Sequence, residues 1–274
     1  MKLNRRQFVL KLVLGSISFV VLDSFWLETN FIEWTEHDIS ESESNKIKAI
    51  HLTDLHLRSI KSVHKSIADR INMERPDVIF FTGDSIERNK NLTVLEDFLS
   101  LINTNIPKIA ILGNKEYSGR IDLQQLKRTY GRYNGKILVN ESLIFETKDR
   151  KINILGIDDF VCGYPDFTKS AQNIDLSLTT VILNHCPVYR EEIDQISATL
   201  NIKPNLILSG HTHGGQITFF GKPFFTPYGS GNYVKGWYNN EISKMYVSKG
   251  VGTTVCFTTA IYQWPSPISS QTAK

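Results

Sequence analysis

The chain has 274 residues, of which 41% are hydrophobic and 22% charged, an ordinary composition for a globular protein with a sizeable core. Its 31 basic and 28 acidic residues leave a net charge of +3, which is too small to favour nucleic acid as a partner. Its three cysteines lack CxxC spacing, so they support neither a disulfide framework nor a structural zinc finger.

The first 25 residues differ from the rest, because a basic start precedes an apolar stretch over residues 12–22. That stretch is shorter than the roughly 20 apolar residues of a comfortable transmembrane helix. Arg5-Arg6 with Phe8 resembles a twin-arginine export signal. We therefore predict a twin-arginine-like signal or a membrane anchor over residues 1–25. The alternative is a fortuitous basic pair in front of an uncleaved anchor.

Residues 26–45 are predicted to be a connector, and residues 46–274 to form one folded domain. Short apolar runs in that domain predict strands at 47–53, 77–82, 107–112, 137–145, 152–157, 179–184, 205–209, 216–220 and 244–248. Helical spacing of apolar residues predicts helices over about 61–74, 92–103, 121–130 and 188–199. Strands that alternate with helices predict an α/β fold with a buried sheet, and the later strands predict a second sheet facing the first.

Five of the predicted strands end in Asp, His or Asn side chains. In chain order these are Asp54 and His56, Asp84, Asn114, His185, and the pair His211 and His213. Ligands bind at the carboxyl ends of strands in open α/β sheets, so we expect these side chains to converge on one crevice. Three oxygen donors and four imidazoles suit divalent transition metal ions. The sequence holds neither a Gly-rich phosphate loop nor a G-x-S-x-G motif.

Residue spacing supports this interpretation at two places. Residues i and i+2 of a strand point to the same side, which suits Asp54 and His56 for one ion. Glycines flank His211-Thr212-His213 and let the backbone bend, so that the two rings can face different ions. Each element alone has a structural alternative, because a lone His185 is more often a loop or core histidine and Gly83-Asp84 is more often a turn. Together, each at a strand end, they predict a metal centre.

The order of these residues resembles that of the calcineurin-like metallophosphoesterase superfamily. The matching motifs are Asp54-Leu55-His56, Gly83-Asp84, Gly113-Asn114-Lys115-Glu116, His185 and Gly210-His211-Thr212-His213. The extension to Gln216, with residues 155–159 and 246–252, resembles a membrane-associated bacterial branch. That branch includes UDP-2,3-diacylglucosamine pyrophosphatases of lipid A synthesis and enzymes assigned only as phosphodiesterases. The resemblance covers about residues 47–255 and implies a calcineurin-like two-sheet β-sandwich flanked by helices, in four αββα layers.

The resemblance also implies which residues bind metal. A first divalent ion would be held by Asp54, His56, Asp84 and His213. A second would be held by Asp84, Asn114, His185 and His211, with Asp84 bridging the two. Mn²⁺ is the first expectation, and Fe and Zn²⁺ are alternatives. Two ions about 3.5–4 Å apart would lower the pKa of a bridging water to form the hydroxide that attacks phosphorus.

We place Asn114, Lys115 and His211 among the catalytic residues. Lys115 departs from the family pattern, which has histidine there, and a lysine is a poor proton donor at neutral pH. A fixed cation can still neutralise charge in the transition state. An alkoxide leaving group needs a proton, whereas a phosphate monoester, with a second pKa near ~6, can leave without one. We therefore hypothesise that Lys115 favours pyrophosphate or activated phosphodiester bonds and that Glu116 helps to keep the lysine charged.

The sequence thus predicts a metal-dependent phosphohydrolase, with UDP-2,3-diacylglucosamine as a candidate substrate. Alternatives are a general phosphodiesterase or phosphatase, and a non-catalytic, membrane-tethered metal-binding protein. The expected partners are a phosphorylated substrate, such as a nucleotide-linked glycolipid, and the membrane through the N-terminus, without nucleic acid. We expect association with the bacterial inner membrane, on the periplasmic side if the twin-arginine signal is used. A lipid A precursor would instead require the cytoplasmic side.

Asp158 and Asp159 also follow a predicted strand but match no ligand position. They are either a structural pair or a support for the site. No protein nucleophile is required by the mechanism above, so we interpret Ser209 and Cys186 as structural.

Overall fold

The computed structural model describes residues 4–6, 11, 15, 32–39, 46–215, 218–219, 222–223, 226–251 and 257–263. The predicted signal or anchor over residues 1–25 therefore lies outside the described residues, apart from positions 4–6, 11 and 15. Within the described part of the chain, no helix combines the length and the hydropathy that a membrane span requires.

The first sheet combines early strands of the domain with two strands from opposite ends of the chain. Among the described residues it has six strands, in the order β1 (Ile32–Asp38), β14 (Phe257–Gln263), β2 (Lys48–Leu52), β3 (Val78–Thr82), β4 (Lys108–Ile111) and β5 (Gly135–Ile137). β2 to β5 are parallel, β14 is antiparallel to β2, and β1 is parallel to β14. Part of the predicted connector is therefore a strand at the edge of this sheet.

The second sheet is built from the later strands. In the described residues its order is β12 (Gly236–Asn239), β13 (Lys244–Val247), β9 (Pro204–Ser209), β8 (Thr179–Leu183), β7 (Lys151–Gly156) and β6 (Glu141–Glu146). The four central strands are parallel, and the two edge strands are antiparallel to their neighbours. The central strands of both sheets are thus parallel, which brings the carboxyl ends of neighbouring strands to the same edge.

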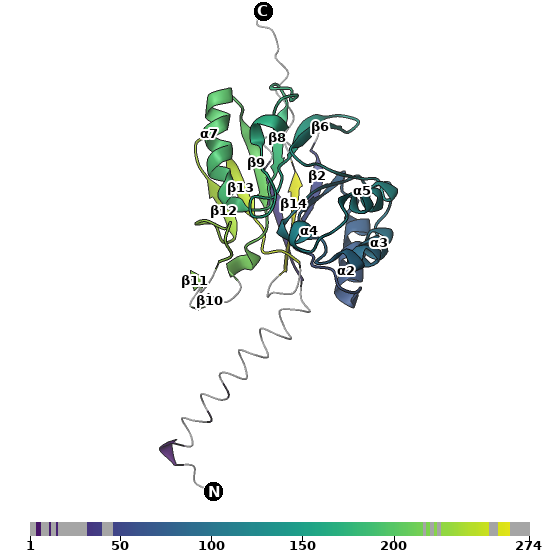
Figure 1. Cartoon of the computed structure of the whole chain (residues 1–274), viewed down its shortest axis with the longest axis vertical. Helices are drawn as coiled ribbons and strands as arrows, with labels where there is room; N and C mark the ends of the chain where they lie inside the picture. Colours follow the sequence, from purple (N-terminus) through teal and green to yellow (C-terminus); the bar gives the residue numbers. More distant parts are fainter. Residues whose placement is uncertain are drawn as a thin grey trace, which may run out of the picture.

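Alternation along each strand explains why the two sheets pack face to face. In β3, Val78 and Phe80 lie in the hydrophobic cluster between the sheets, whereas Ile79 and Phe81 pack against helices. The helices on that outer face are α2 (Ser62–Glu74), α3 (Leu92–Ser100) and α5 (Leu123–Arg132). Those on the opposite outer face are α6 (Phe167–Ser170) and α7 (Arg190–Leu200). Figure 1 shows the resulting helix–sheet–sheet–helix arrangement, which confirms the predicted α/β fold with four αββα layers.

The predicted strand at 137–145 is wrong, because this stretch forms β5 and β6, which belong to different sheets. Between them Asn140 adopts a left-handed backbone with φ of +53°. Its side-chain oxygen accepts hydrogen bonds from the amides of Asp158 and Asp166. Because these partners are distant in sequence, no local pattern could predict the break.

The predicted strand at 216–220 lies partly outside the described residues. Its described part is the strand β10 (Thr218–Phe219), which pairs with β11 (Lys222–Pro223). Short 3₁₀ segments of the described residues lie in the connections at Asn89–Asn91, Pro187–Tyr189 and His213–Gly215.

Candidate metal centre

The candidate site lies where five strands, three from the first sheet and two from the second, reach their carboxyl ends. All seven predicted ligands meet there, in two groups that share one carboxylate. After β2, β3 and β4 come Asp54, His56, Asp84 and Asn114, and after β8 and β9 come His185, His211 and His213. Asn114 is also the first residue of the short helix α4 (Asn114–Ser118), which the sequence did not predict.

The first group surrounds the carboxylate of Asp54. Its Oδ1 atom lies 3.5 Å from Nε2 of His213 and 3.8 Å from Nε2 of His56. Those two ring nitrogens are 3.3 Å apart. Asp54 Oδ1 is buried and has no hydrogen-bond partner among the described residues. A buried carboxylate oxygen without a donor is costly, so this arrangement fits a bound cation.

The second group surrounds His185. Its Nε2 atom lies 3.2 Å from Oδ1 of Asn114, 3.3 Å from Nδ1 of His211 and 3.6 Å from Oδ1 of Asp84. The other carboxylate oxygen of Asp84 lies 3.6 Å from Nε2 of His56 in the first group. Asp84 therefore stands between the two groups, with one oxygen toward each.

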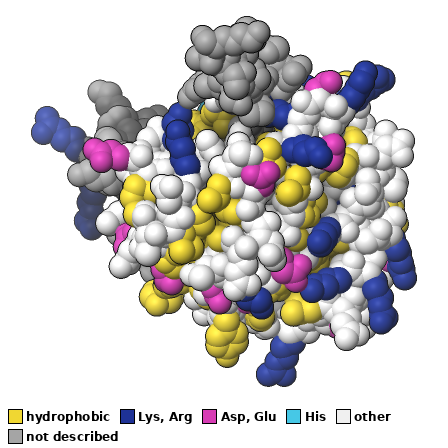
Figure 2. All heavy atoms as spheres, turned by 90° about the horizontal axis from the view of Figure 1, so that it is seen from above, with side chains coloured by type: hydrophobic (Ala, Val, Ile, Leu, Met, Phe, Trp, Pro, Cys, Tyr) yellow, Lys and Arg dark blue, Asp and Glu magenta, His cyan; other side chains and the backbone are white. Residues whose placement is uncertain are grey.

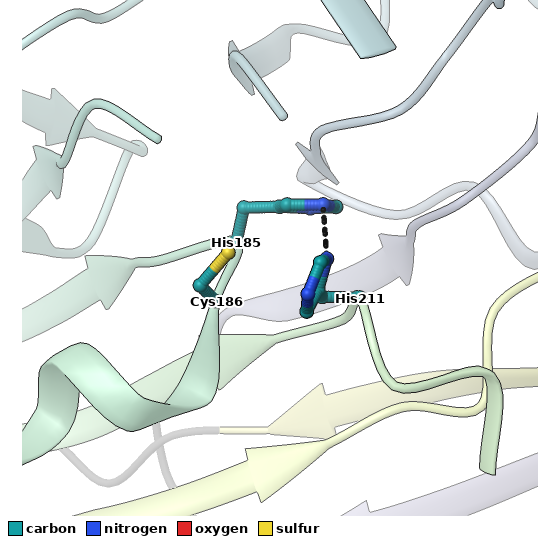
Figure 3. Close-up of side chains that lie close together, drawn as sticks. All are labelled: His185, Cys186 and His211. Atoms are coloured by element: carbon teal, nitrogen blue, oxygen red, sulfur yellow. Dashed lines mark hydrogen bonds between the residues drawn. The ribbon is translucent and has the colours of Figure 1, made fainter. Parts of the chain in front are cut away.

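Cys186 is close to the second group, and its sulfur lies within 4.8 Å of ligand nitrogens of His185 and His211. In Figure 3 the dashed line joins a ring nitrogen of His185 to one of His211, the two rings are steeply inclined to each other, and Cys186 lies to one side of the line. The Cys186 thiol donates instead to Oδ1 of Asp159, at 3.2 Å. Burial raises the pKa of this thiol well above its usual range, so it stays protonated and is a poor metal ligand.

Backbone carbonyls fix which nitrogen of two histidines faces the site. His185 Nδ1 lies 2.7 Å from the carbonyl oxygen of Thr82, and His211 Nε2 lies 2.8 Å from that of Tyr228. A carbonyl can only accept, so each of these nitrogens carries the hydrogen in the neutral ring. The lone pairs of His185 Nε2 and His211 Nδ1 are then directed at Asn114 and at the centre of the group.

The protonation of the site also suits a cation. Burial lowers the pKa of His56 to about 4, and burial together with His185 lowers the pKa of His211 to about 4, so both rings are neutral. Burial raises the pKa of Asp84 well above its usual range. Burial lowers the pKa of His185, but the carboxylates of Asp84 and Asp54 outweigh it and raise that pKa to about 9. His185 is therefore protonated at neutral pH when no metal is bound, and a cation held at this group would displace that proton.

The backbone is strained at the candidate ligands. Five of them have left-handed backbone angles, with φ values from +44° to +71°, and these are Asp54, His56, Asp84, His211 and His213. In the described part of the chain ten non-glycine residues have a positive φ, and five of these ten are candidate ligands. Such angles are uncommon outside glycine and persist where the surrounding structure imposes them, often at functional sites.

The glycines of the motifs are needed because the backbone approaches other groups too closely for a side chain. A Cβ atom on Gly113 would lie 2.4 Å from Oδ1 of Asp84. A Cβ atom on Gly210 would lie 2.0 Å from Oγ1 of Thr53. Any larger residue would therefore displace the loops that carry the ligands.

Glu116 holds two of these loops together, a role that the sequence prediction missed. Its buried carboxylate accepts hydrogen bonds from the backbone amides of Gly113 (2.8 Å), Asp84 (2.9 Å) and Ser85 (2.8 Å). Among the described residues this carboxylate makes no ion pair with Lys115, and the expectation that Glu116 helps to keep the lysine charged stays a prediction. The Gly-x-x-Glu spacing from residue 113 to residue 116 is that of a capping box, which could have indicated this role.

Lys115 lies at the edge of the site rather than in it. Its backbone amide donates to Oδ1 of Asp84 at 2.8 Å, while its half-buried side chain lines a neighbouring cavity. The lysine is therefore next to the candidate metal centre without occupying a ligand position.

Asp158 and Asp159 are structural. Oδ1 of Asp158 accepts from the hydroxyl of Tyr117 at 2.5 Å and Oδ2 from the amide of Tyr164 at 2.9 Å. Asp159 accepts from the amide of Cys162 at 2.6 Å and from the Cys186 thiol. Both carboxylates are buried and satisfied within the protein, so they brace α4 and the loop after β7 instead of facing the centre.

Comparison with known proteins identifies the class. The family model of calcineurin-like phosphoesterases matches residues 47–215. The chain belongs to this family. The metallophosphoesterase YkuE of Bacillus subtilis is 30% identical over 273 residues, which cover 92% of each chain. The phosphodiesterase YaeI of Escherichia coli is 26% identical, over 83% of this chain and 84% of its own.

A solved structure supports the fold. The protein TT1561 of Thermus thermophilus matches this structure with a TM-score of 0.50, at 10% sequence identity, and the match covers 76% of this chain and 91% of that one. At this level of identity the similarity concerns the architecture alone.

Family membership and the geometry agree on a metal-dependent hydrolase of phosphoric esters. In the described part of the chain, three buried clusters of histidine, aspartate and cysteine side chains are close enough to hold metal, and two of them contain Asp54. The chain is thus a metallophosphoesterase whose histidines and aspartates are grouped where a divalent ion would bind.

Proposed function

We propose that the chain is a two-metal phosphohydrolase that cleaves a pyrophosphate or activated phosphodiester bond. The observation that carries this proposal is the position of Asp84, whose two oxygens each lie 3.6 Å from a histidine of a different group. One shared carboxylate between two clusters of nitrogen donors favours a pair of ions over a single one. Mn²⁺ is our first choice of metal, with Fe and Zn²⁺ as alternatives.

The first ion would be held by Asp54, His56, Asp84 and His213, and the second by Asp84, Asn114, His185 and His211. When bound, such ions act as Lewis acids on phosphoryl oxygens and make water a better nucleophile at neutral pH. The remaining tasks fall to the chain itself. Oδ1 of Asn114 faces the two histidines, which leaves its amide N–H groups to donate to a phosphoryl oxygen.

Lys115 is the reason why we propose a pyrophosphate or activated phosphodiester as the bond that is cleaved. The Lys115 side chain lines the cavity beside the centre, where its positive charge favours the buildup of negative charge on a substrate, but a lysine protonates a leaving alkoxide poorly. A leaving phosphate needs no such proton, because its second pKa is near ~6. UDP-2,3-diacylglucosamine has a pyrophosphate bond of this kind, and the apolar stretch at 12–22 would suit a membrane-borne substrate of this type.

A general phosphodiesterase is the second candidate, since the relative from Escherichia coli is named as a phosphodiesterase. The full chain, purified and loaded with Mn²⁺, separates the two when it is assayed on UDP-2,3-diacylglucosamine and on bis(p-nitrophenyl) phosphate. We expect turnover of the pyrophosphate with the higher kcat/KM. Higher kcat/KM on the simple diester would favour the second candidate.

The Asp84→Asn variant is the control that tests whether hydrolysis in this assay depends on the candidate metal centre. It keeps the shape of the side chain and removes its charge. We expect it to lose about a hundredfold or more in kcat on every substrate. If the loaded wild-type protein binds metal but turns over neither substrate, the proposal fails and the chain is a metal-binding protein.

A further inference from the structure

A basic cavity adjoins the candidate metal centre. It has a volume of about 500 Å³, and its charged lining consists of Arg58, Glu87, Arg88, Lys115 and Arg120. Two of these residues contact the centre itself. The amide of Lys115 donates to Asp84, and Oε1 of Glu87 lies 3.8 Å from Nδ1 of His56, the ring nitrogen opposite the one that faces Asp54.

Positive charge dominates this cavity. Among the described residues that line it, Glu87 is the only one with a carboxylate, and Nε and Nη2 of Arg58 already donate to that carboxylate at 2.6 and 2.7 Å. No acidic side chain of the described residues forms an ion pair with Arg88, Lys115 or Arg120. A second cavity of about 290 Å³ shares part of this lining and adds Lys90. On the face drawn in Figure 2, Lys and Arg side chains lie among acidic and hydrophobic ones.

The backbone at the end of α4 places Arg120 at this cavity. A Cβ atom on Gly119 would lie 2.1 Å from the carbonyl oxygen of Glu87, so the helix end packs directly on that segment. Arg120 follows in a left-handed conformation with φ of +52°, which an arginine rarely adopts. The amides of Gly119 and Arg120 bond to carbonyls of Lys115 and Tyr117. An anion in the cavity would therefore be bound by side chains.

We propose that this cavity is a subsite for a second phosphate group of the substrate, adjacent to the phosphorus attacked at the metal centre. The assignment rests on the proposed function and narrows its substrate class to diphosphate-linked compounds. Guanidinium groups match phosphate oxygens in paired hydrogen bonds, and Arg88 and Arg120 have no protein carboxylate to compete with them. A substrate with a single diester group leaves the cavity empty and gains nothing from it.

Binding of two non-hydrolysable anions tests the subsite without any need for turnover. Methylphosphonate carries one phosphonate group and methylenediphosphonate carries two, and calorimetry with the Mn²⁺-loaded full chain gives a Kd for each. In the wild type we expect the second group to improve Kd by about tenfold or more. In the Arg88→Gln/Arg120→Gln variant we expect an improvement below about threefold. Both arginines are exposed, so their replacement leaves the core unchanged.

The Arg128→Gln/Arg132→Gln variant is the matched control. These arginines lie on α5 and are exposed, and Arg132 pairs with Glu96 of α3 at 2.8 Å. We expect this variant to keep the full wild-type improvement. Both variants lose two exposed arginines. Only in the Arg88→Gln/Arg120→Gln variant do the lost arginines line the cavity.

Three results would overturn the subsite. The first is an equal improvement in wild type and in the Arg88→Gln/Arg120→Gln variant, because both phosphonates would then lie at the metal. The second is no improvement in the wild type. The third is binding of two equivalents of methylphosphonate without any gain for the diphosphonate, which would indicate a site for free phosphate. Absence of hydrolysis in the assay above refutes the proposed function and leaves this binding result intact.

Discussion

At the scale of single residues, Lys115 and its neighbour Glu116 have separate tasks. The carboxylate of Glu116 is buried against three backbone amides and forms no ion pair with the lysine in the described part of the chain. The amide of Lys115 is bound to Asp84, and its side chain lines the basic cavity. The position next to Asn114 thus provides a cation that is available to the substrate.

The Lys115→His variant tests what that cation selects. Histidine can donate a proton near neutral pH, so we expect hydrolysis of alkyl phosphodiesters to improve relative to pyrophosphates, by about tenfold in the ratio of kcat/KM values. Kinetics on one substrate of each kind measure this ratio. Lys127→His, an exposed change on α5, is the control and leaves the ratio as it is. An unchanged ratio in Lys115→His would contradict the role given to the lysine.

At the scale of elements, α4 fastens the loops after β3 and β4 to each other. The three amides that Glu116 accepts from belong to both loops, and these loops carry Asp84 and Asn114. Together with the hydrogen bond from the Lys115 amide to Asp84, this carboxylate fixes the distance between the two candidate ligands.

The Glu116→Gln variant should loosen this connection. The amide group of glutamine keeps one accepting oxygen and places an NH₂ group against backbone N–H donors, which leaves buried donors unsatisfied. We expect a loss of about 1–3 kcal/mol in the free energy of unfolding and a drop in kcat. Urea unfolding with an unchanged m-value measures the loss. Glu96→Gln, at the exposed pair with Arg132, should cost less than about 0.5 kcal/mol. Equal costs in the two variants would refute the role of Glu116.

Elements with a strong local signal were predictable from the sequence, and those that depend on distant partners were not. The apolar runs of β2, β3, β4, β8 and β9 are buried on both faces, so their ends and the polar residues after them could be located from the pattern alone. β1 and β14 were missed, because each is defined by pairing between opposite ends of the chain.

The candidate site likewise has a part that the sequence could predict and a part that it could not. Its seven predicted ligands follow predicted strand ends, and the structure brings them together as expected. The basic cavity could not be predicted, because Arg58, Arg88 and Arg120 form no motif and meet only through the packing of α4 on Glu87. Whether the seven residues bind metal stays a prediction.

At the scale of the whole molecule, the candidate metal centre lies at the seam between the two sheets. The first group combines Asp54 and His56 from the first sheet with His213 from the second. The second group combines Asn114 from the first sheet with His185 and His211 from the second. Metal bound at either group would therefore link the two halves of the fold, and it could bind only when they are packed together.

Removal of metal should then lower thermal stability as well as activity. An ion that binds only the folded state stabilises it by about 2.7 kcal/mol when its concentration is a hundred times Kd. For a domain of this size that corresponds to a rise in Tm of roughly 5–10 °C. Scanning calorimetry of the full chain after dialysis against a chelator, and again after addition of Mn²⁺, measures the difference.

The Asp84→Asn variant separates binding at the seam from binding elsewhere on the surface. Because Asp84 faces both groups, its loss should weaken metal binding at each, and the Mn²⁺-dependent rise in Tm should shrink to less than about half of the wild-type value. Its Tm without metal should stay close to that of the metal-free wild type, since asparagine keeps an oxygen for the amide of Lys115. If Mn²⁺ raises the Tm of both proteins equally, the stabilising ions are bound away from Asp84 and the two sheets are not linked through this centre.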